Sequence, residues 1–199
     1  MRIEDNPIRG LIRDLVAGVD AYDDRESSDQ KWMLEWIDSS AEIFRQEKPM
    51  TPPEHLAVYA ALLDEDDGAI MLVSHLKARR WLCPGGHVDP DEDPRETVVR
   101  ELQEELDVDP GFHSRFGDGP AFLSVTETVP PHSHTDVTLW FVLSMPRRSP
   151  ITPDPAEFSA VRWFQLDDPE GWQAENCFDP EMSRFVRKVA AALEPVDVS

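Results

Sequence analysis

Cysteine and long apolar runs are scarce in this sequence of 199 residues. Its two cysteines, Cys83 and Cys177, can build neither a disulfide framework nor a cysteine-based zinc site, and we expect Cys83 to pack as a small buried side chain. No apolar run approaches the roughly 18 residues that indicate a membrane span. The amino-terminal segment also lacks the apolar core of a secretion signal. These absences predict a cytoplasmic protein with no membrane partner.

Basic residues are also scarce. The chain has 19 Lys and Arg against 40 Asp and Glu, which gives a net charge of −21. A surface of this charge repels nucleic acid backbones, so we expect no long nucleic acid partner. A small phosphorylated ligand remains compatible with the sequence if a metal ion supplies the missing positive charge.

The amino-terminal part of the chain is predicted to be helical. A first helix is expected over residues 7–20, and a second helix carries apolar residues from Trp32 to Phe44 at helical spacing. The proline-rich stretch KPMTPPEH then ends the helical pattern. We therefore divide the chain into a helical extension, residues 1–48, and a main domain, residues 49–199. The extension has three open roles, which are to cap the sheet, to form a homodimer contact or to close over the substrate.

The main domain alternates strand and helix patterns. Strand-like runs on both sides of EDDG predict a hairpin, and a short strand and a glycine turn follow in RRWLCPGGHV. Further strands are expected near residues 121–127, 136–144 and 159–166, with a last helix over 180–193. The fold class is therefore α/β of the α+β type, with a mixed sheet between helices.

Residues 85–110 contain ten acidic residues and only two basic ones. Asp93 and Pro94 have the residue types of a helix start, as cap and first helical residue. On a helix over residues 94–106, one arc carries the apolar residues Val98, Val99, Leu102 and Leu106. A second arc carries Glu101, Glu104 and Glu105. This second arc is either a solvated acidic face or a site for Mg²⁺, which prefers oxygen ligands.

The spacing around this helix favours the metal site. Gly86 is followed after five residues by Glu92, and after seven more by the stretch RELQEE. This pattern resembles the signature of the Nudix hydrolase superfamily, Gx5Ex7REUxEExGU, in which U is a bulky aliphatic residue. The matching residues are Gly86, Glu92, Arg100, Glu101, Leu102, Glu104, Glu105 and Val108. Asp107 stands where the family has its last glycine, and Asp is among the residues that best tolerate a left-handed turn.

The resemblance implies a Nudix-like fold and a role for each matching residue. Glu101 and Glu105 would be the principal ligands of Mg²⁺, with Mn²⁺ as the alternative, and Glu104 would bind directly or through water. The carbonyl of Gly85 would be a further ligand. Arg100 would orient the carboxylates, Gly86 would support the metal-binding loop, and Glu92 would either support the loop and the helix or help bind a further metal. Glu101, Glu104, Glu105 and Arg100 are thus the predicted catalytic residues, while the base that activates water is left open between a glutamate and a residue outside the motif.

Several residues outside the motif are candidates for substrate contact. His132, His134 and Asp136 alternate before a strand and would share one face, as a polar strand entry, as part of the substrate cleft or as metal ligands. Arg79, with Lys77 and Arg80, forms a basic island that would meet either the phosphates or surface acids. Trp81 and Trp140 would stack on a base or pack in the core.

Together these features predict a Mg²⁺-dependent hydrolase of a diphosphate linkage in a small nucleotide or a nucleoside diphosphate conjugate. The alternatives are a Nudix domain that only binds a nucleotide, hydrolysis of damaged triphosphates, and a prenyl diphosphate isomerase or hydrolase. The binding-only alternative is disfavoured because such domains usually lack motif glutamates that this sequence retains. The isomerase alternative lacks a cysteine in the expected strand.

Overall fold

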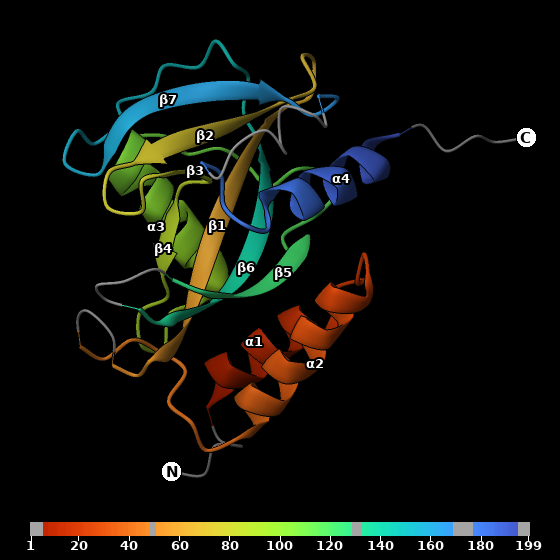
Figure 1. Cartoon of the computed structure of the whole chain (residues 1–199), viewed down its shortest axis with the longest axis vertical. Helices are drawn as coiled ribbons and strands as arrows, with labels where there is room; N and C mark the ends of the chain where they lie inside the picture. Colours follow the sequence, from red (N-terminus) through yellow and green to blue (C-terminus); the bar gives the residue numbers. More distant parts are fainter. Residues whose placement is uncertain (1–5, 48–50, 129–132, 169–176, 195–199) are drawn as a thin grey trace, which may run out of the picture.

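The structure is a computed structural model that describes residues 6–47, 51–128, 133–168 and 177–194. One sheet and four helices make up this part of the chain (Figure 1). The helices are α1 (Pro7–Ala17), α2 (Asp24–Asp38), α3 (Pro94–Leu106) and α4 (Met182–Leu193). The strands are β1 (Glu54–Asp64), β2 (Ala69–His75), β3 (Arg80–Leu82), β4 (Gly85–His87), β5 (Phe122–Glu127), β6 (Thr135–Ser144) and β7 (Phe158–Gln165).

The sheet is mixed, as the sequence predicts. Its main path has the order β3-β2-β1-β6-β5, with β4 paired to β1 and β7 paired to β2. The two central strands, β1 and β6, are parallel from Glu54↔Thr135 to Leu63↔Ser144, and the other pairs are antiparallel. Because β1 and β6 begin side by side, residues near their amino ends lie next to one another.

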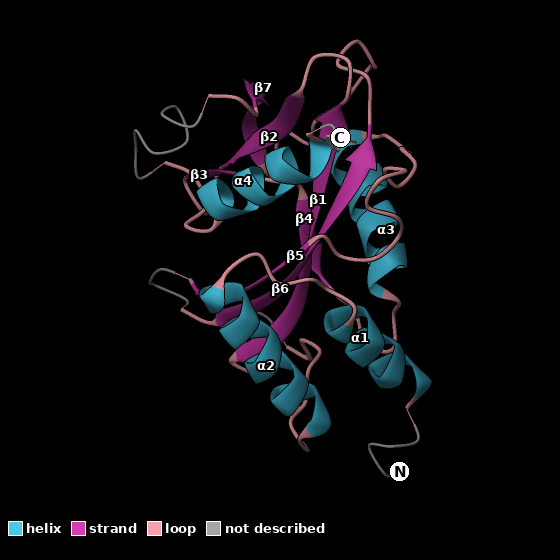
Figure 2. Cartoon of the chain, turned by 90° about the vertical axis from the view of Figure 1, so that its right-hand side faces the viewer, coloured by secondary structure: helices cyan, strands magenta, loops and turns pink. Residues whose placement is uncertain are grey.

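Two apolar cores lie on the two faces of the sheet. One contains Val58 of β1 together with side chains of α1, α2 and α3, such as Ile12, Met33 and Leu102. The other contains Trp140 of β6, which is fully buried, together with side chains of α4. Figure 2 shows α3 and α4 on opposite sides of the strands. Trp140 is therefore a core residue, which is one of the two roles that the sequence left open for it.

The second amino-terminal helix differs from the prediction. It begins at Asp24 and ends at Asp38, whereas the apolar pattern continues to Phe44. Ser39 ends the helix because its backbone is extended and its hydroxyl donates to the carbonyl of Trp36 (2.6 Å). Ile43 and Phe44 are buried without being helical, and the Ile43 carbonyl accepts from the Leu56 amide (2.8 Å). The spacing of these apolar residues correctly indicated that they are buried. An extended segment can bury side chains at the same positions, so the spacing did not require a helix.

The helical extension is joined to the rest of the molecule by charged side chains. The buried carboxylate of Glu26 accepts from the Leu123 amide of β5 (3.0 Å) and from Lys188 of α4 (2.8 Å). Arg184 of α4 pairs with Asp23, and Arg25 of α2 pairs with Glu181 (2.6 Å). We call these residues, Asp23, Arg25, Glu26, Glu181, Arg184 and Lys188, the α2–α4 ion-pair network. They hold the helical hairpin beside strand β5.

Helix α3 begins and ends as its sequence predicts. Asp93 caps it by accepting from the Arg95 amide (2.9 Å), and Pro94 is its first residue. At the other end, Asp107 has a left-handed backbone with φ 57° and ψ 45°. Two orphan carbonyls of the last turn, those of Glu105 and Leu106, accept from the amides of Asp154 (2.8 Å) and Thr152 (2.7 Å). The Asp in place of glycine thus keeps the turn of the motif.

One residue of the predicted apolar stripe is misplaced. Val99 is 38% exposed, whereas Thr97 is fully buried. The orientation of the helix about its axis turns Glu105 toward β4, where its carboxylate accepts from the Gly85 amide (3.0 Å). In this orientation Val99 faces away from the core. No helix in the described part of the chain is long and apolar enough to cross a membrane.

Candidate metal-binding active site

Two glycines let β4 approach both the sheet and helix α3. Gly85 has φ 149°, and a Cβ there would lie 2.1 Å from the carbonyl oxygen of Val58. A Cβ on Gly86 would lie 2.3 Å from a carboxylate oxygen of Glu101. A side chain at position 85 would thus clash with the β1 backbone, and one at position 86 would displace the Glu101 carboxylate from its place beside β4.

Glu105 is the most confined carboxylate of α3. It is 6% exposed, and its Oε2 atom accepts from the Gly85 amide (3.0 Å). Burial, followed by the negative charge of Glu101, raises the pKa of Glu105 to about 8, although the Gly85 hydrogen bond opposes this shift. The anionic form of Glu105 is therefore costly unless a cation lies beside it.

Glu101 and Glu104 complete the predicted ligand set. Burial raises the pKa of Glu101, and the ion pair with Arg100 Nη1 (2.8 Å) only partly offsets this rise. Glu104 is more open, with 63% of its side chain exposed, and it lies 3.7 Å from the same Arg100 nitrogen. One guanidinium thus serves a group of carboxylates that repel one another, which is the charge pattern of a cation site.

Arg100 and Glu92 form a rigid pair behind these carboxylates. Arg100 binds Glu92 through two contacts, Nε to Oε1 (2.8 Å) and Nη2 to Oε2 (2.9 Å). The Thr97 hydroxyl also donates to Glu92 (2.8 Å). Burial alone would raise the pKa of Glu92, but these hydrogen bonds lower it, so Glu92 stays charged. The structure thus brings Arg100 and Glu92 together, which fixes the direction of the Arg100 side chain.

A fourth carboxylate joins the group from outside the motif. The negative charge of Glu157 contributes to the raised pKa of both Glu101 and Glu105. Its loop is held against α3 by the hydrogen bond from the Asp154 amide to the Glu105 carbonyl (2.8 Å). We call Glu101, Glu104, Glu105 and Glu157 the carboxylate cluster. Glu157 has no motif of its own, so the sequence could not single it out among many acids.

Arg45 is a second residue that sequence reasoning missed. Its guanidinium is partly buried, which lowers its pKa, while the charges of Asp136, Asp89 and Glu101 raise it. In a chain of net charge −21, Arg45 is one of few cations close enough to feel the charge of Glu101, as it also feels that of Asp136. No local pattern marks it, because Arg45 reaches the site from the segment after α2.

The basic island ahead of the motif reaches the carboxylate cluster through Lys77. Lys77 lies 3.6 Å from Glu157 of that cluster, whereas Arg80 donates to the carbonyl of Phe178 (2.8 Å). Arg79 is exposed in the turn between β2 and β3. Trp81 packs edge-on against Phe164, with ring centroids 5.3 Å apart. Arg79 and Trp81 thus remain predicted substrate residues for which the structure supplies no contact with the carboxylate cluster.

His134 and Asp136 belong to a different group. They lie at the start of β6 beside His55 and His87, and the four side chains converge. Side chains alternate between the two faces of β1, and those on the same face as His55 belong to the core beside α4. Gly86, which pairs with β1 at Val58, faces α3 instead. His134 and Asp136 therefore lie on the face of the sheet opposite the carboxylate cluster. His132 falls outside the described residues.

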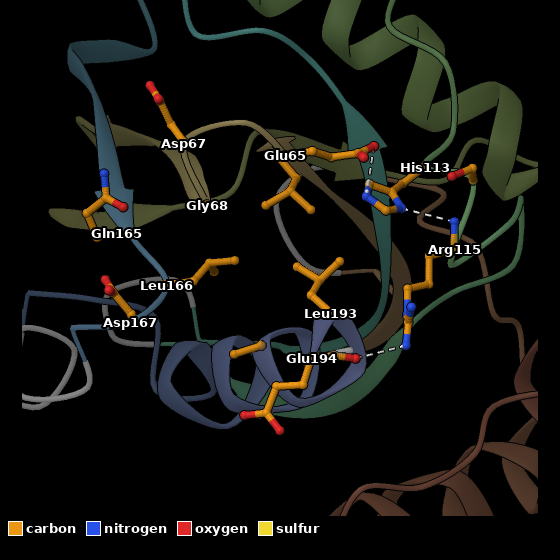
Figure 3. A pocket seen from close by; sticks show the side chains of 13 residues that line it. Glu65, Asp67, Gly68, His113, Arg115, Gln165, Leu166, Asp167, Leu193 and Glu194 are labelled. Carbon is orange, nitrogen blue, oxygen red and sulfur yellow. Dashed lines mark hydrogen bonds and ion pairs between the residues drawn. The ribbon is translucent and has the colours of Figure 1, made fainter. Parts of the chain in front are cut away.

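A wide pocket opens at the carboxyl end of β1 (Figure 3). Its volume is about 840 Å³, and it is lined by residues of the β1–β2 turn, the segment between α3 and β5, the end of β7 and the end of α4, among them Glu65, His113 and Glu194. None of the lining residues belongs to the motif. The candidate site is thus defined by its charges and by the glycine turn.

Comparison with known proteins agrees with the motif and the fold. The family model of the NUDIX domain matches residues 53–189. Diphosphoinositol polyphosphate phosphohydrolase 3-alpha of Mus musculus is 26% identical over 150 residues, covering 73% of this chain and 85% of that protein. The RNA pyrophosphohydrolase of Gluconacetobacter diazotrophicus is 33% identical over 97 residues, covering 43% and 57%.

Solved structures show the same fold. The Ap4A hydrolase of C. elegans, in a binary complex, superposes with a TM-score of 0.51 at 18% identity, covering 69% of this chain and 95% of that one. A NUDIX family hydrolase from Clostridium perfringens gives 0.51 at 19% identity, covering 70% and 95%. The family match spans most of the chain and includes the whole motif, from Gly86 to Val108. The chain therefore belongs to the NUDIX domain family, and the relatives named above are hydrolases.

Proposed function

We propose that this protein hydrolyses a diphosphate linkage in a small nucleotide or a nucleoside diphosphate conjugate, with Mg²⁺ as its cofactor and Mn²⁺ as the alternative. The observation that carries this proposal is the pair of the buried Glu105 and the partly buried Glu101 against the glycine turn, where one arginine cannot balance the negative charge. The relatives support the linkage, since their names refer to diphosphoinositol polyphosphates, RNA and Ap4A.

The residues of the site divide the work in the following way. Glu101 and Glu105 would hold the cation, with Glu104 and the Gly85 carbonyl as further ligands. The bound cation would neutralise the phosphate oxygens of the substrate. Arg100, fixed by Glu92, orients Glu101. Gly86 keeps the space that the Glu101 carboxylate occupies.

Glu157 is the proposed base that takes a proton from the attacking water. It lies outside the motif and close enough to Glu101 and Glu105 to raise the pKa of each. A carboxylate beside the cation is in position to accept a proton as the water attacks phosphorus. Arg45 would bind a phosphate oxygen, and Arg79 and Trp81 would contact the distal part of the substrate.

The acidic surface limits the partners of this reaction. A small phosphorylated substrate can approach with its cation, whereas a long nucleic acid or an anionic membrane would be repelled by a net charge of −21. We also propose that the enzyme is cytoplasmic. A homodimer is the proposed assembly, because Trp32 on the helical extension is 39% exposed and stacks on Trp36 at its surface.

The test is phosphate release from a panel of nucleoside diphosphate conjugates, nucleoside triphosphates, prenyl diphosphates and diphosphoinositol polyphosphates. Each substrate is assayed with Mg²⁺, with Mn²⁺ and with a chelator. Turnover should require the divalent ion and should appear with at least one nucleotide conjugate. If no substrate is turned over with either ion, the chain is a binding domain and the proposed activity is wrong.

Glu105→Gln is the decisive variant. Loss of a buried charged ligand should lower kcat by about 10²–10⁴-fold, the range found for a positioned acid–base group. Glu96→Gln is the matched control, because Glu96 is an exposed acid in the first turn of the same helix and should keep full activity. Circular dichroism of both variants checks the fold. Full activity in a folded Glu105→Gln protein would remove the assignment.

A further inference from the structure

Four side chains on the other face of the sheet form a compact group. His55 lies on β1, His87 on β4, His134 just before β6, and Asp136 on β6. One ligand atom from each of them lies within 4.8 Å of every other. We call them the histidine–aspartate cluster. We propose that this cluster is a second metal site, separate from the carboxylate cluster, that binds Zn²⁺ through all four side chains.

Strand register explains why these residues meet. His55 is directly opposite Asp136 in the parallel β1–β6 pair, and His87 is opposite Ala57 in the β1–β4 pair. His55 and Ala57 point to the same face of β1, and His134 and Asp136 point to the same face of β6. Residues far apart in the sequence therefore converge at the amino ends of the two central strands.

The distances fit a tetrahedral ion. The Oδ1 atom of Asp136 lies 3.1 Å from His134 Nε2, 3.3 Å from His87 Nε2 and 3.8 Å from His55 Nε2. Four ligands on a zinc ion with bonds of about 2.0–2.1 Å are separated by about 3.3–3.4 Å. The distances from Asp136 Oδ1 to His134 and His87 are thus close to this separation, the distance to His55 would shorten, and all four donor atoms lie within 4.8 Å of one another.

His55 is arranged so that its metal-binding nitrogen is free of a proton. Its Nδ1 atom lies 2.8 Å from the carbonyl oxygen of Pro52, which can only accept, so Nδ1 carries the hydrogen. Nε2, which lies 3.8 Å from the Oδ1 atom of Asp136, then carries a free lone pair. A backbone carbonyl that fixes the tautomer in this way is the usual partner of a metal-binding histidine.

Without a cation, the centre of this cluster has unsatisfied acceptors. Within the described residues, the Nε2 atoms of His55 and His87 and the Oδ1 atom of Asp136 are buried and make no well-aligned hydrogen bond, although Asp136 Oδ1 lies close to His134 (3.1 Å) and His87 (3.3 Å). His55 is fully buried, so water does not compensate its nitrogen. An unpaired buried polar atom costs about 1–3 kcal/mol, and three of them facing one another indicate that a ligand belongs between them.

The chemical types of the four ligands indicate which metal ion the cluster would bind. Three imidazoles and one carboxylate suit Zn²⁺, whereas Mg²⁺ prefers oxygen ligands and retained water. Four protein ligands also fill a tetrahedral shell, which is typical of a structural zinc site. Such an ion would tie together β1, β4 and β6. Because His87 follows Gly85 and Gly86, it would also fix the glycine turn from the face opposite α3.

The experiment measures metal directly. Wild-type protein is stripped with a chelator, dialysed, given ZnCl₂, and passed over a desalting column before elemental analysis. About one zinc ion per chain should remain, and Zn²⁺ but not Mg²⁺ should raise the Tm. Co²⁺ in place of Zn²⁺ should give the visible absorption of a tetrahedral ion.

Variants separate this site from other binding. Asp136→Asn and His55→Gln should lower zinc affinity by at least about 100-fold, the upper range for loss of a mere supporting partner. His113→Gln, which alters another buried histidine, and Glu105→Gln in the carboxylate cluster should both keep the zinc. The proposal is wrong if stripped wild-type protein, shown to be folded, retains no zinc. It is equally wrong if Glu105→Gln loses the ion while Asp136→Asn keeps it.

Discussion

Two acidic regions of this molecule carry their charge in opposite ways. In the carboxylate cluster, Arg100 is the one cation of α3 that pairs with the glutamates, and the pKa of Glu105 rises to about 8. In the α2–α4 ion-pair network, each carboxylate has a cation beside it, and the hydrogen bonds from Arg184 help to lower the pKa of Asp23 to about 2. Carboxylates are therefore destabilised in their charged form in the carboxylate cluster and stabilised in it in the α2–α4 ion-pair network.

This difference separates architecture from chemistry. Paired charges hold the helical extension to α4 and to strand β5, and they have no remaining demand for a ligand. The carboxylates beside the glycine turn are only partly neutralised by their cations and keep such a demand, which a divalent ion can meet. In a chain of net charge −21, acidity alone says little, and the local balance of charge identifies the site.

The largest effect on stability is expected when a cation is removed from the α2–α4 ion-pair network, so that its carboxylates resemble those of the carboxylate cluster. Lys188→Met leaves the carboxylate of Glu26 fully buried without its ammonium partner. Removal of one member of a buried pair costs about 3–5 kcal/mol, and the free energy of unfolding in urea should fall by this amount. Lys31→Met is the control, because Lys31 and Glu35 are exposed and 4.0 Å apart, so the change should stay below about 0.5 kcal/mol.

The double variant Glu26→Gln/Lys188→Met completes this test. Removing both charges should recover part of the lost stability, since no buried charge is then left unpaired. If Lys188→Met costs no more than Lys31→Met, the network does not hold the helices to α4. The contrast between the two regions would then be wrong.

A smaller effect is expected from pH. The folded-state pKa of Asp23 is about 2, below its ordinary value of 3.8, so this carboxylate stabilises the fold above pH 4. That contribution should be lost as the pH falls from about 4 to about 2. Because 35% of the Asp23 side chain is exposed, solvent screening limits the effect to about 1 kcal/mol.

The measurement is urea unfolding at a series of pH values for wild type and Asp23→Asn. The stability difference between the two should be greatest near neutral pH and should shrink below pH 4. A difference that stays constant down to pH 2 would show that Arg184 does not lower this pKa.

The smallest effect concerns the end of the motif. Asp107 has φ 57°, a conformation that costs a non-glycine residue about 1–2 kcal/mol. Asp107→Gly should therefore raise the free energy of unfolding by only about 0.5–1 kcal/mol, because the relief of strain is partly offset by the larger chain entropy of glycine in the unfolded state. Asp107→Ala should lower it, because alanine keeps the strain and loses the contact with Gln103 (2.6 Å). Equal stability of the two variants would show that the turn is not strained.

Much of the carboxylate site could be predicted because it is local in the sequence. The cap at Asp93, the helix that follows and the turn at Asp107 depend on interactions within one helix and its ends. Helical spacing also placed Glu101 and Glu105 together. It could not show that Val99 is exposed, because the roll of the helix depends on the strand against which it packs.

The parts that escaped prediction are contacts between distant segments. Glu157 and Arg45 reach the carboxylates from loops without a motif. His55 and His87 carry no signal of their own, although His134 and Asp136 were noticed. The early end of α2 at Asp38 was missed for a related reason, since burial of Ile43 and Phe44 imitates a helical pattern.

The sequence by itself determined the family, the mixed fold and the carboxylates of α3, because these follow from residue types at short, fixed spacings. Only the tertiary structure decided which charges are paired and which are not. It brought Glu157 to Glu105, Lys188 to Glu26, and three histidines to Asp136. The physical reason is that Coulomb energy and desolvation depend on distance and burial in space, and strand register sets both for residues far apart along the chain.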